Sequence, residues 1–159
     1  MIVSPLEQTF NYNKMLEEFL SFQPGHQLSE NYQTAEVFNR DYSNTIKENC
    51  PYTIEVCETL KLQFKYNFVL FRSMAPHSTL SWHKDSDCDS VSYHIPIATN
   101  FACFYAYIDR LYPMQELGRL YSVLNQENHT FINAGPTPRV HLHLINDRGG
   151  QYLRRNFLG

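Results

Sequence analysis

Four residues in the second half of the chain could bind a metal ion and a carboxylate. His83 and Asp85 are two positions apart, so on an extended strand both side chains would leave by the same face and converge. His129 comes later, just before a strand-like run, and Arg139 follows it by ten residues. Two imidazoles and one carboxylate form a ligand set for iron(II) that leaves coordination positions open. An arginine beyond them can hold a distal carboxylate through its planar guanidinium group.

Short runs of strand-like sequence surround these four positions and must place them. Turn residues such as Pro, Gly, Asn and Asp separate the runs. The strands predicted in this way are 65–74, 91–97, 101–108, 116–124, 130–132 and 139–146. Several short strands after a helical lead-in indicate a β-sandwich or barrel rather than a parallel α/β sheet.

The N-terminal part, 1–62, is predicted to be this helical lead-in. Apolar residues recur at helical spacing over 11–22, and the Pro-Gly pair that follows ends the helix. Pro51 suits the first position of a second helix, 51–62, because its missing N–H would have no helical partner there. The stretch 26–44 has no clean period, and we expect loops with one short strand or turn.

The length and composition suit one domain. A chain of 159 residues can bury a proper core, and its eleven Tyr, eleven Phe and one Trp favour strands. We therefore predict a single domain, 1–159, in which a β-sheet core (63–147) follows the lead-in and a C-terminal tail (148–159) ends the chain. The net charge of −3, without any run of Lys or Arg, argues against a nucleic-acid partner.

The cysteines and the N-terminus favour a cytoplasmic location. The four cysteines form no Cys-x-x-Cys pair, and a chain of this size does not need a disulfide framework, so free thiols are expected. The N-terminus lacks the regions of a secretory signal, and no apolar run reaches the roughly 18 residues of a membrane span. No membrane partner is therefore expected, and the oligomeric state is left open.

The order His-x-Asp, a distant His and then Arg resembles that of the 2-oxoglutarate and iron(II)-dependent oxygenases. Within them, the segment 92–100 (Ser-Tyr-His-Ile-Pro-Ile-Ala-Thr-Asn) and the run Arg-Val-His-Leu-His-Leu from Arg139 look most like the aspartyl/asparaginyl β-hydroxylase group. The resemblance covers about 65–147. It implies a mainly β fold, namely a double-stranded β-helix of the jelly-roll or cupin type with N-terminal helices packed on one sheet.

The resemblance also implies the site and the reaction. His83, Asp85 and His129 would bind Fe(II). Arg139 would bind the C5 carboxylate of 2-oxoglutarate, and His94 would assist with the same cosubstrate. With O2 as the other cosubstrate, the products would be succinate, CO2 and a hydroxylated primary substrate. That substrate is expected to be an amino-acid side chain, either free as a small molecule or within a peptide or protein.

Other interpretations stay open for single residues. Asp85 lies in a run with two further aspartates and could be a solvated turn residue, and His94 could be an ordinary strand histidine. Trp82 alternates with His83 and is expected to pack rather than contact substrate. Arg72 is expected to form a surface ion pair, with a contact to an anionic substrate group as the alternative.

Alternation along 139–145 predicts two different faces for the last strand. The aliphatic residues at 140, 142 and 144 would face the core, while Arg139, His141 and His143 would face solvent or a polar lumen. We expect both histidines to line that lumen rather than bind metal. Ser92 occupies a position where some members of the similar group have an arginine, which puts a second arginine contact in question.

Two rival functions are compatible with parts of this pattern. A cupin-type metalloenzyme would use the same three metal ligands without 2-oxoglutarate, but Arg139 argues against it. A non-catalytic jelly-roll binding module would use the histidines only for structure. A module of that kind would gain no thermal stability from Fe(II) or Mn(II).

Overall fold

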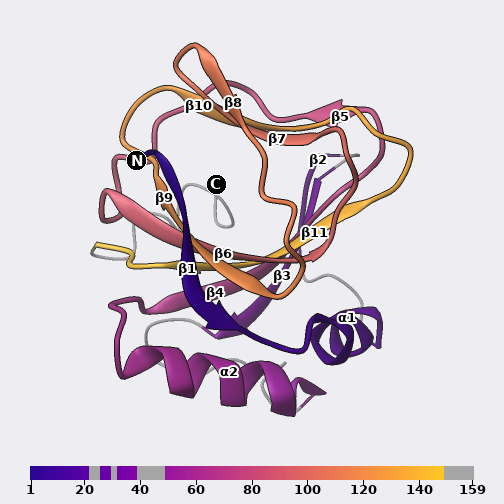
Figure 1. The fold of residues 1–159 in the computed structure, drawn as a ribbon, viewed down its shortest axis with the longest axis vertical. Coiled ribbons are helices and arrows are strands. Elements are labelled where there is room, and N and C mark those ends of the chain that lie inside the picture. Colours follow the sequence, from indigo (N-terminus) through magenta and orange to yellow (C-terminus); the bar gives the residue numbers. More distant parts are fainter. Residues whose placement is uncertain (22–25, 30–31, 39–48, 149–159) are drawn as a thin grey trace.

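Two antiparallel sheets face each other, and two helices cover the outer face of the larger sheet (Figure 1). This computed structural model describes residues 1–21, 26–29, 32–38 and 49–148. The larger sheet has the order β1 (Val3–Thr9), β9 (Arg119–Leu124), β6 (Val91–Ala98), β11 (Arg139–Ile145), β4 (Phe68–Met74), β3 (Tyr32–Phe38) and β2 (His26–Ser29). The smaller sheet has the order β5 (Ser78–Thr79), β10 (His129–Asn133), β7 (Cys103–Tyr107) and β8 (Arg110–Tyr112).

From β4 to β11 the chain passes back and forth between the two sheets. Strands β4, β6, β9 and β11 belong to the larger sheet, and β5, β7, β8 and β10 to the smaller one. This alternation winds the chain into a double-stranded β-helix, so the fold prediction is confirmed. The space between the sheets is the lumen of the fold.

The alternating sequence of β11 divides the larger sheet into an outer and an inner face. Val140, Leu142 and Leu144 belong to the hydrophobic core between this sheet and the helices α1 (Tyr12–Leu20) and α2 (Pro51–Lys61). The residues between them, Arg139, His141 and His143, are buried on the inner face. The two-faced prediction for this strand is therefore confirmed, and its polar face lines the lumen rather than solvent.

Both predicted helices form, with ends shifted by two residues or fewer. Met15 and Phe19 on α1 point into the core, and the Asn11 side chain caps the helix by accepting a hydrogen bond from Lys14 N at 3.3 Å. Helix α2 begins at Pro51, as the sequence indicates. The two helices pack beside each other against the larger sheet (Figure 1).

The description of 1–62 as a helical lead-in is wrong in part, because three strands also lie there. Strand β1 pairs with β9 at one edge of the larger sheet, and β3 and β2 extend the other edge beyond β4. The prediction for 26–44, loops with one short strand or turn, fell short of the two paired strands β2 and β3. Its remaining residues, 30–31 and 39–44, lie outside the described residues. The short strands β5 and β8 stand where turns were expected. Edge strands depend on partners far away in the chain, which a local period does not reveal.

The cysteines are free thiols, as predicted, and all four are buried. In the described part of the chain, neither helix has the length and hydrophobicity needed to cross a membrane. The predicted C-terminal tail, apart from Arg148, lies outside the described residues.

Candidate functional site

His83 and His129 are brought together by a backbone bridge between the two sheet-forming segments that carry them. His83 N donates to His129 O at 3.0 Å, and His129 N donates to His83 O at 2.9 Å. Residues paired directly in this way place their side chains on the same face. The two imidazole rings accordingly lie edge to face, with centroids 4.4 Å apart.

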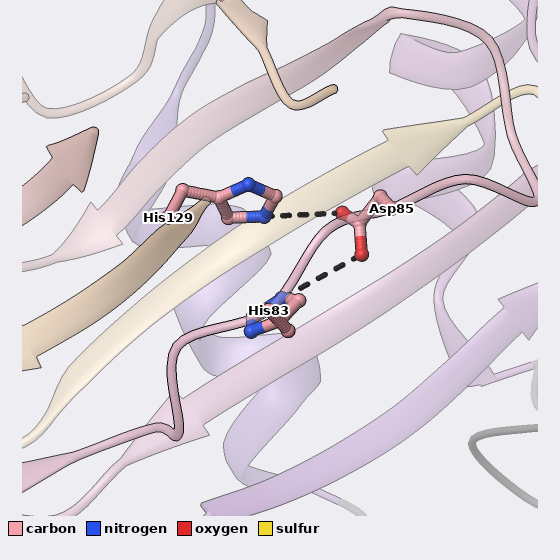
Figure 2. Close-up of side chains that lie close together, drawn as sticks. All are labelled: His83, Asp85 and His129. Atoms are coloured by element: carbon pink, nitrogen blue, oxygen red, sulfur yellow. Dashed lines mark ion pairs between the residues drawn. The ribbon is translucent and has the colours of Figure 1, made fainter. Parts of the chain in front are cut away.

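Asp85 completes a cluster with the two histidines (Figure 2). One carboxylate oxygen, Oδ1, lies 3.5 Å from His83 Nε2, and the other, Oδ2, lies 3.4 Å from His129 Nε2. Ligand atoms on adjacent positions of one octahedral ion, at bond lengths of about 2.1 Å, are about 3 Å apart. Among the described residues, this is the one group of three His, Cys, Asp or Glu side chains whose ligand atoms lie within 4.8 Å of one another.

The hydrogen bonds of the two histidines fix which ring nitrogen faces the cluster. His83 Nδ1 lies 2.8 Å from Ser81 O, and His129 Nδ1 lies 2.8 Å from Glu127 O. A carbonyl oxygen only accepts hydrogen bonds, so Nδ1 must donate, and in a neutral ring Nε2 then carries a lone pair. In both rings this lone pair faces a carboxylate oxygen. Two lone pairs that face each other need a proton or a metal ion between them, and the three side chains together offer the donor set of a metal site.

The electrostatics favour the protonation states that metal ligands need. Burial lowers the pKa of His83 and outweighs the opposing effects of the Ser81 carbonyl and Asp85, so its ring is neutral near pH 7. Burial alone would raise the pKa of Asp85, but the contact with His129 and the charge of Arg72 are among the effects that lower it below its usual value. Asp85 is therefore a carboxylate.

Of the three cluster side chains, that of His83 is the most exposed to solvent. The side chain of His83 is 38% exposed, whereas those of Asp85 and His129 are 10% and 2% exposed. Trp82 lies next to this opening in sequence and is 55% exposed, so the prediction that it packs in the interior is wrong. It lines a surface hollow of about 400 Å³ with Ile108, Glu127 and Asn128. A second molecule can reach the metal ligands from the side of His83.

Three further histidines and an arginine are buried in the lumen. The Nδ1 atoms of His94 and His141 lie 3.4 Å apart, and the ring of His143 stacks on that of His94. Arg139 is 2% exposed, and its guanidinium group lies 4.5 Å from the centroid of the Phe131 ring. Phe131 also contacts His94, with ring centroids 5.2 Å apart. The lumen therefore offers polar donors and a fixed positive charge beside an aromatic wall.

The lumen histidines are held neutral. Burial is the main cause that lowers the pKa of His94, His141 and His143 well below the usual value, and the charge of Arg139 adds to it in each case. Within the described part of the chain, neither ring nitrogen of His143 has a hydrogen-bond partner, and neither does His141 Nε2. Buried polar atoms of this kind normally have partners, so a polar ligand is expected here.

The structure places the predicted site residues in one region. The three predicted metal ligands form the cluster, and Arg139 and His94 both lie in the lumen against the Phe131 ring. Sequence reasoning missed Phe131, although its position two residues after His129 on a strand puts both on one face.

Two further polar residues of the larger sheet, Ser92 and Arg72, are buried. Ser92 is buried beside His94, with Ser92 Oγ 3.5 Å from His94 Nε2. Arg72 is only 7% exposed, so the surface position expected for this residue is wrong. On β4, Arg72 lies between Phe71 and Ser73. The polar side chain of such a strand residue can face an interior lumen as readily as solvent, and the sequence does not separate the two.

One comparison with known proteins gives the family of the chain, and another gives its fold. Residues 5–147 match the sequence profile described as aspartyl/asparaginyl beta-hydroxylase. No curated protein matches the chain significantly in sequence. A 2OG-Fe(II) oxygenase family oxidoreductase from Burkholderia pseudomallei has a similar structure, with a TM-score of 0.65 and 10% identity over 92% of this chain and 86% of that one.

Two prolyl hydroxylases are also similar in structure. The Pseudomonas putida prolyl-4-hydroxylase has a TM-score of 0.61 and 16% identity over 93% of this chain and 94% of its own. The Trichoplax adhaerens prolyl hydroxylase, solved with a hypoxia inducible factor oxygen degradation domain peptide fragment, has a TM-score of 0.64 and 11% identity over 96% and 86%. At these identities the likeness establishes the shared fold.

Proposed function

Because the chain belongs to the aspartyl/asparaginyl β-hydroxylase family of 2-oxoglutarate and iron(II)-dependent oxygenases, we propose that it hydroxylates an amino-acid side chain of a peptide, a protein or a free amino acid. One observation carries the proposal: each oxygen of the Asp85 carboxylate faces the Nε2 atom of one histidine, His83 or His129. This donor set binds a metal from one side and leaves positions for cosubstrate and oxygen.

The roles of the metal ligands follow from their surroundings. His83 and His129 would each bind Fe(II) through Nε2, while the hydrogen bond from Nδ1 to a backbone carbonyl keeps the ring oriented. Asp85 would supply the one negative charge of the ligand set. When bound with 2-oxoglutarate and O2, the iron supplies the oxidising power to put a hydroxyl group on an unactivated carbon, with succinate and CO2 as co-products.

Arg139 and His94 would hold the cosubstrate in the lumen. Arg139 is a buried cation, so a carboxylate beside it gains a charge-assisted hydrogen bond that little water weakens. Phe131 restricts where the guanidinium group can lie. His94 is neutral and its ring contacts those of Phe131 and His143, and it would donate one hydrogen bond to a carboxylate oxygen. If the protein were instead a cupin-type metalloenzyme that does not use 2-oxoglutarate, this buried arginine would have no role in binding a cosubstrate.

The primary substrate would approach from the side of His83. That side chain is the most exposed of the three ligands, and Trp82 beside it offers an exposed aromatic surface. The hollow that Trp82 lines is open enough for the side chain of a peptide. The peptide in the Trichoplax adhaerens structure belongs to that protein, and it supports a peptide as the substrate class to test first.

An anaerobic titration tests the proposal. The metal-free protein would be mixed with Fe(II) and then with 2-oxoglutarate, and the weak visible charge-transfer band of a chelated Fe(II)–2-oxoglutarate complex would be followed. We expect the band in the parent protein, its loss in His129→Ala, and a need for about 10- to 100-fold more 2-oxoglutarate in Arg139→Ala. An exposed arginine, Arg110, provides the control variant Arg110→Ala, which should behave like the parent.

The two rival functions give different results in the same experiment. Metal binding without the band at any 2-oxoglutarate concentration would favour the metalloenzyme that does not use this cosubstrate. No binding of Fe(II) or Mn(II) by the folded parent protein would contradict the proposed function.

A further inference from the structure

We propose that the hollow beside Trp82 binds a basic side chain, lysine or arginine, of a peptide substrate, a few residues from the position that is hydroxylated. Among the described residues, this hollow is lined by Trp82, Ile108, Glu127 and Asn128. Given the proposed function of the metal cluster, on which this inference rests, the hollow would select the substrate by its charge at a place outside the cluster.

Two of the lining residues are joined directly to metal ligands. Trp82 precedes His83, Asn128 precedes His129, and backbone hydrogen bonds of 3.0 and 2.9 Å bridge the two histidines. Successive side chains of an extended segment leave by opposite faces, so the hollow and the metal cluster lie on two sides of one rim. An extended peptide covers about 3.3–3.6 Å per residue. A peptide that crosses the rim can therefore have one side chain in the hollow and another, a few residues away, beside the metal.

The walls of the hollow include two apolar side chains that the fold leaves in solvent. Trp82 is 55% exposed and Ile108 is 60% exposed. The φ of Ile108 is 57°, in a region that β-branched residues rarely adopt, and Ile108 N donates to Asn128 O at 3.0 Å. Neither burial nor backbone preference favours isoleucine here. Strained residues of this kind gather at ligand sites, and this one keeps an aliphatic side chain in the wall of the hollow.

Glu127 carries the one charge among the four lining residues. Its Oε2 atom pairs with Lys84 Nζ at 3.2 Å, which leaves Oε1 for a second cation. Both side chains of this ion pair are exposed, so the pair contributes little and can rearrange around a ligand at small cost. Asn128 is exposed as well, and its side-chain oxygen can accept a hydrogen bond. The hollow therefore combines an aromatic and an aliphatic wall with acceptors for a cation.

A basic side chain matches this combination better than an apolar or an acidic one. The aliphatic stem of lysine or arginine can pack on Ile108 while its charged end lies over the Trp82 indole and beside Glu127. A hollow of about 400 Å³ leaves room for one such side chain. An acidic side chain would face the Glu127 carboxylate, and an apolar one would leave the carboxylate without a part in binding.

Trp82 is the only tryptophan of the chain, so its fluorescence reports directly on the hollow. The Zn(II)-loaded protein would be titrated with three capped tripeptides that have glycine at both ends and lysine, norleucine or glutamate at the centre. Norleucine keeps the aliphatic stem of lysine without the ammonium group. We expect the lysine peptide to bind about 3- to 30-fold more tightly than the norleucine peptide, and the glutamate peptide to bind most weakly.

Two variants and a control separate recognition from structure. Glu127→Gln should reduce the advantage of the lysine peptide over the norleucine peptide by about 2- to 5-fold. Ile108→Asn introduces a residue type that tolerates the positive φ, so it should weaken both peptides by about 2- to 5-fold without lowering the free energy of unfolding. The matched control is Glu116→Gln, which removes an exposed carboxylate that pairs with Arg119 at 2.8 Å and should leave binding unchanged.

Proton NMR tests whether the bound side chain lies beside the metal. Mn(II) is paramagnetic and broadens the signals of nearby ligands, whereas Zn(II) is diamagnetic. With Mn(II) kept below the protein concentration, we expect the lysine side-chain signals to broaden with the Mn(II)-loaded protein and to stay sharp with the Zn(II)-loaded one. The broadening should be weaker in Glu127→Gln, because less of the peptide is bound.

Each other outcome contradicts the inference in a specific way. Equal or tighter binding of the norleucine peptide would make the hollow an apolar site, and a preference for glutamate would assign recognition to Lys84. No binding of any peptide, or a lysine advantage that persists in full in Glu127→Gln, would exclude the proposed recognition. Peptide binding without broadening, in a protein that does bind Mn(II), would place the peptide away from the metal cluster.

Failure of the proposed function gives a different result. A folded protein that binds neither Mn(II) nor Zn(II) would defeat the metal site itself. The fluorescence titration of the metal-free protein would still show whether the hollow prefers lysine, so the two failures are distinguishable.

Discussion

The imidazole rings of His94 and His143 stack in the lumen, with centroids 3.9 Å apart and planes 20° apart. They are cross-strand partners on β6 and β11, and both are almost completely buried. Two imidazolium rings could not stack in this way, because their charges would repel each other in a site that water does not reach. The folded protein therefore cannot hold both rings charged, and burial favours the neutral form of each.

Stability should fall as the pH falls below about 6.5. The folded-state pKa values of His94, His141 and His143 lie well below the usual value, chiefly because of burial, so the unfolded chain binds more protons in acid than the folded one. Above the unfolded pKa of about 6.5, the three histidines are neutral in both states and cost the folded protein no stability. As the pH falls below that value, protons bind preferentially to the unfolded chain and the free energy of unfolding falls. Each histidine can contribute up to about 1.4 kcal/mol per pH unit. Urea unfolding between about pH 7.5 and 5.5 measures this slope.

Two variants separate the lumen histidines from other titrating groups. His143→Gln removes one buried imidazole and should make the slope shallower by about one histidine's share. The exposed His77→Asn keeps a residue type that tolerates the local φ of 55° and should leave the slope unchanged. An equal slope in the parent and in His143→Gln would contradict the assignment.

Mn(II) should stabilise the protein through the cluster of His83, Asp85 and His129. At a free concentration 100 times its Kd, a ligand that binds only the folded state adds about 2.7 kcal/mol to the free energy of unfolding. For a chain of this size, that corresponds to a rise in Tm of roughly 5–10 °C. Asp85→Ala removes the carboxylate that faces both histidines, so the rise should disappear. Thermal unfolding followed by circular dichroism measures the Tm of the parent protein and of Asp85→Ala, each with and without Mn(II).

Asp87→Ala is the matched control for this experiment. Asp87 is an acid of the same loop, and it does not belong to the cluster that could hold a metal. The variant should keep the full rise in Tm. A loss of the rise in Asp87→Ala, together with its persistence in Asp85→Ala, would show that the wrong carboxylate has been assigned.

Asn133→Ala should lower both stability and cosubstrate affinity. The Asn133 side chain is completely buried and donates to the carbonyl oxygens of Met74, Ala75 and Thr137 at 2.9–3.2 Å. Its removal leaves these carbonyls short of donors, and we expect a loss of about 2–4 kcal/mol in the free energy of unfolding. Because Thr137 lies two residues before Arg139, the affinity for 2-oxoglutarate should also fall several-fold.

The exposed Asn128→Ala serves as the control for stability. It removes the same side chain from the turn before β10 and should change the free energy of unfolding by less than about 0.5 kcal/mol. Chemical unfolding gives the free energy of unfolding of each variant, and calorimetry gives its affinity for 2-oxoglutarate. Normal stability in Asn133→Ala would contradict the importance of this hydrogen-bond network.

Glu18→Gln should destabilise the pair of helices without affecting the metal cluster. The Glu18 carboxylate on α1 accepts hydrogen bonds from Tyr52 N at 2.6 Å and from Thr53 N and Thr53 Oγ1 at 2.9 and 2.5 Å, so it caps the first turn of α2. Replacing a carboxylate at such a position costs about 1–2 kcal/mol. Glu17→Gln, on the exposed face of α1, should cost little. Urea unfolding compares the two, and equal stabilities would show that the cap contributes nothing.

Much of this protein could be predicted from its local sequence patterns. The two helices follow from apolar spacing and from Pro51, and the two faces of β11 follow from strict alternation. The candidate metal ligands were named from the His-x-Asp spacing and the later histidine. Such patterns are local, because a side chain's face within one helix or strand depends only on the period of that element.

The tertiary structure decided what depends on partners distant in the chain. The pairing of β1, β2 and β3 at the sheet edges and the bridge between His83 and His129 are such long-range contacts. Arg72 had the same sequence appearance as a surface residue, and only the closing of one sheet over the other buried it in the lumen. The sequence by itself therefore determined which residues could do the chemistry, and the long-range register determined which of them share one enclosed space, because that space is formed only when the two sheets pack.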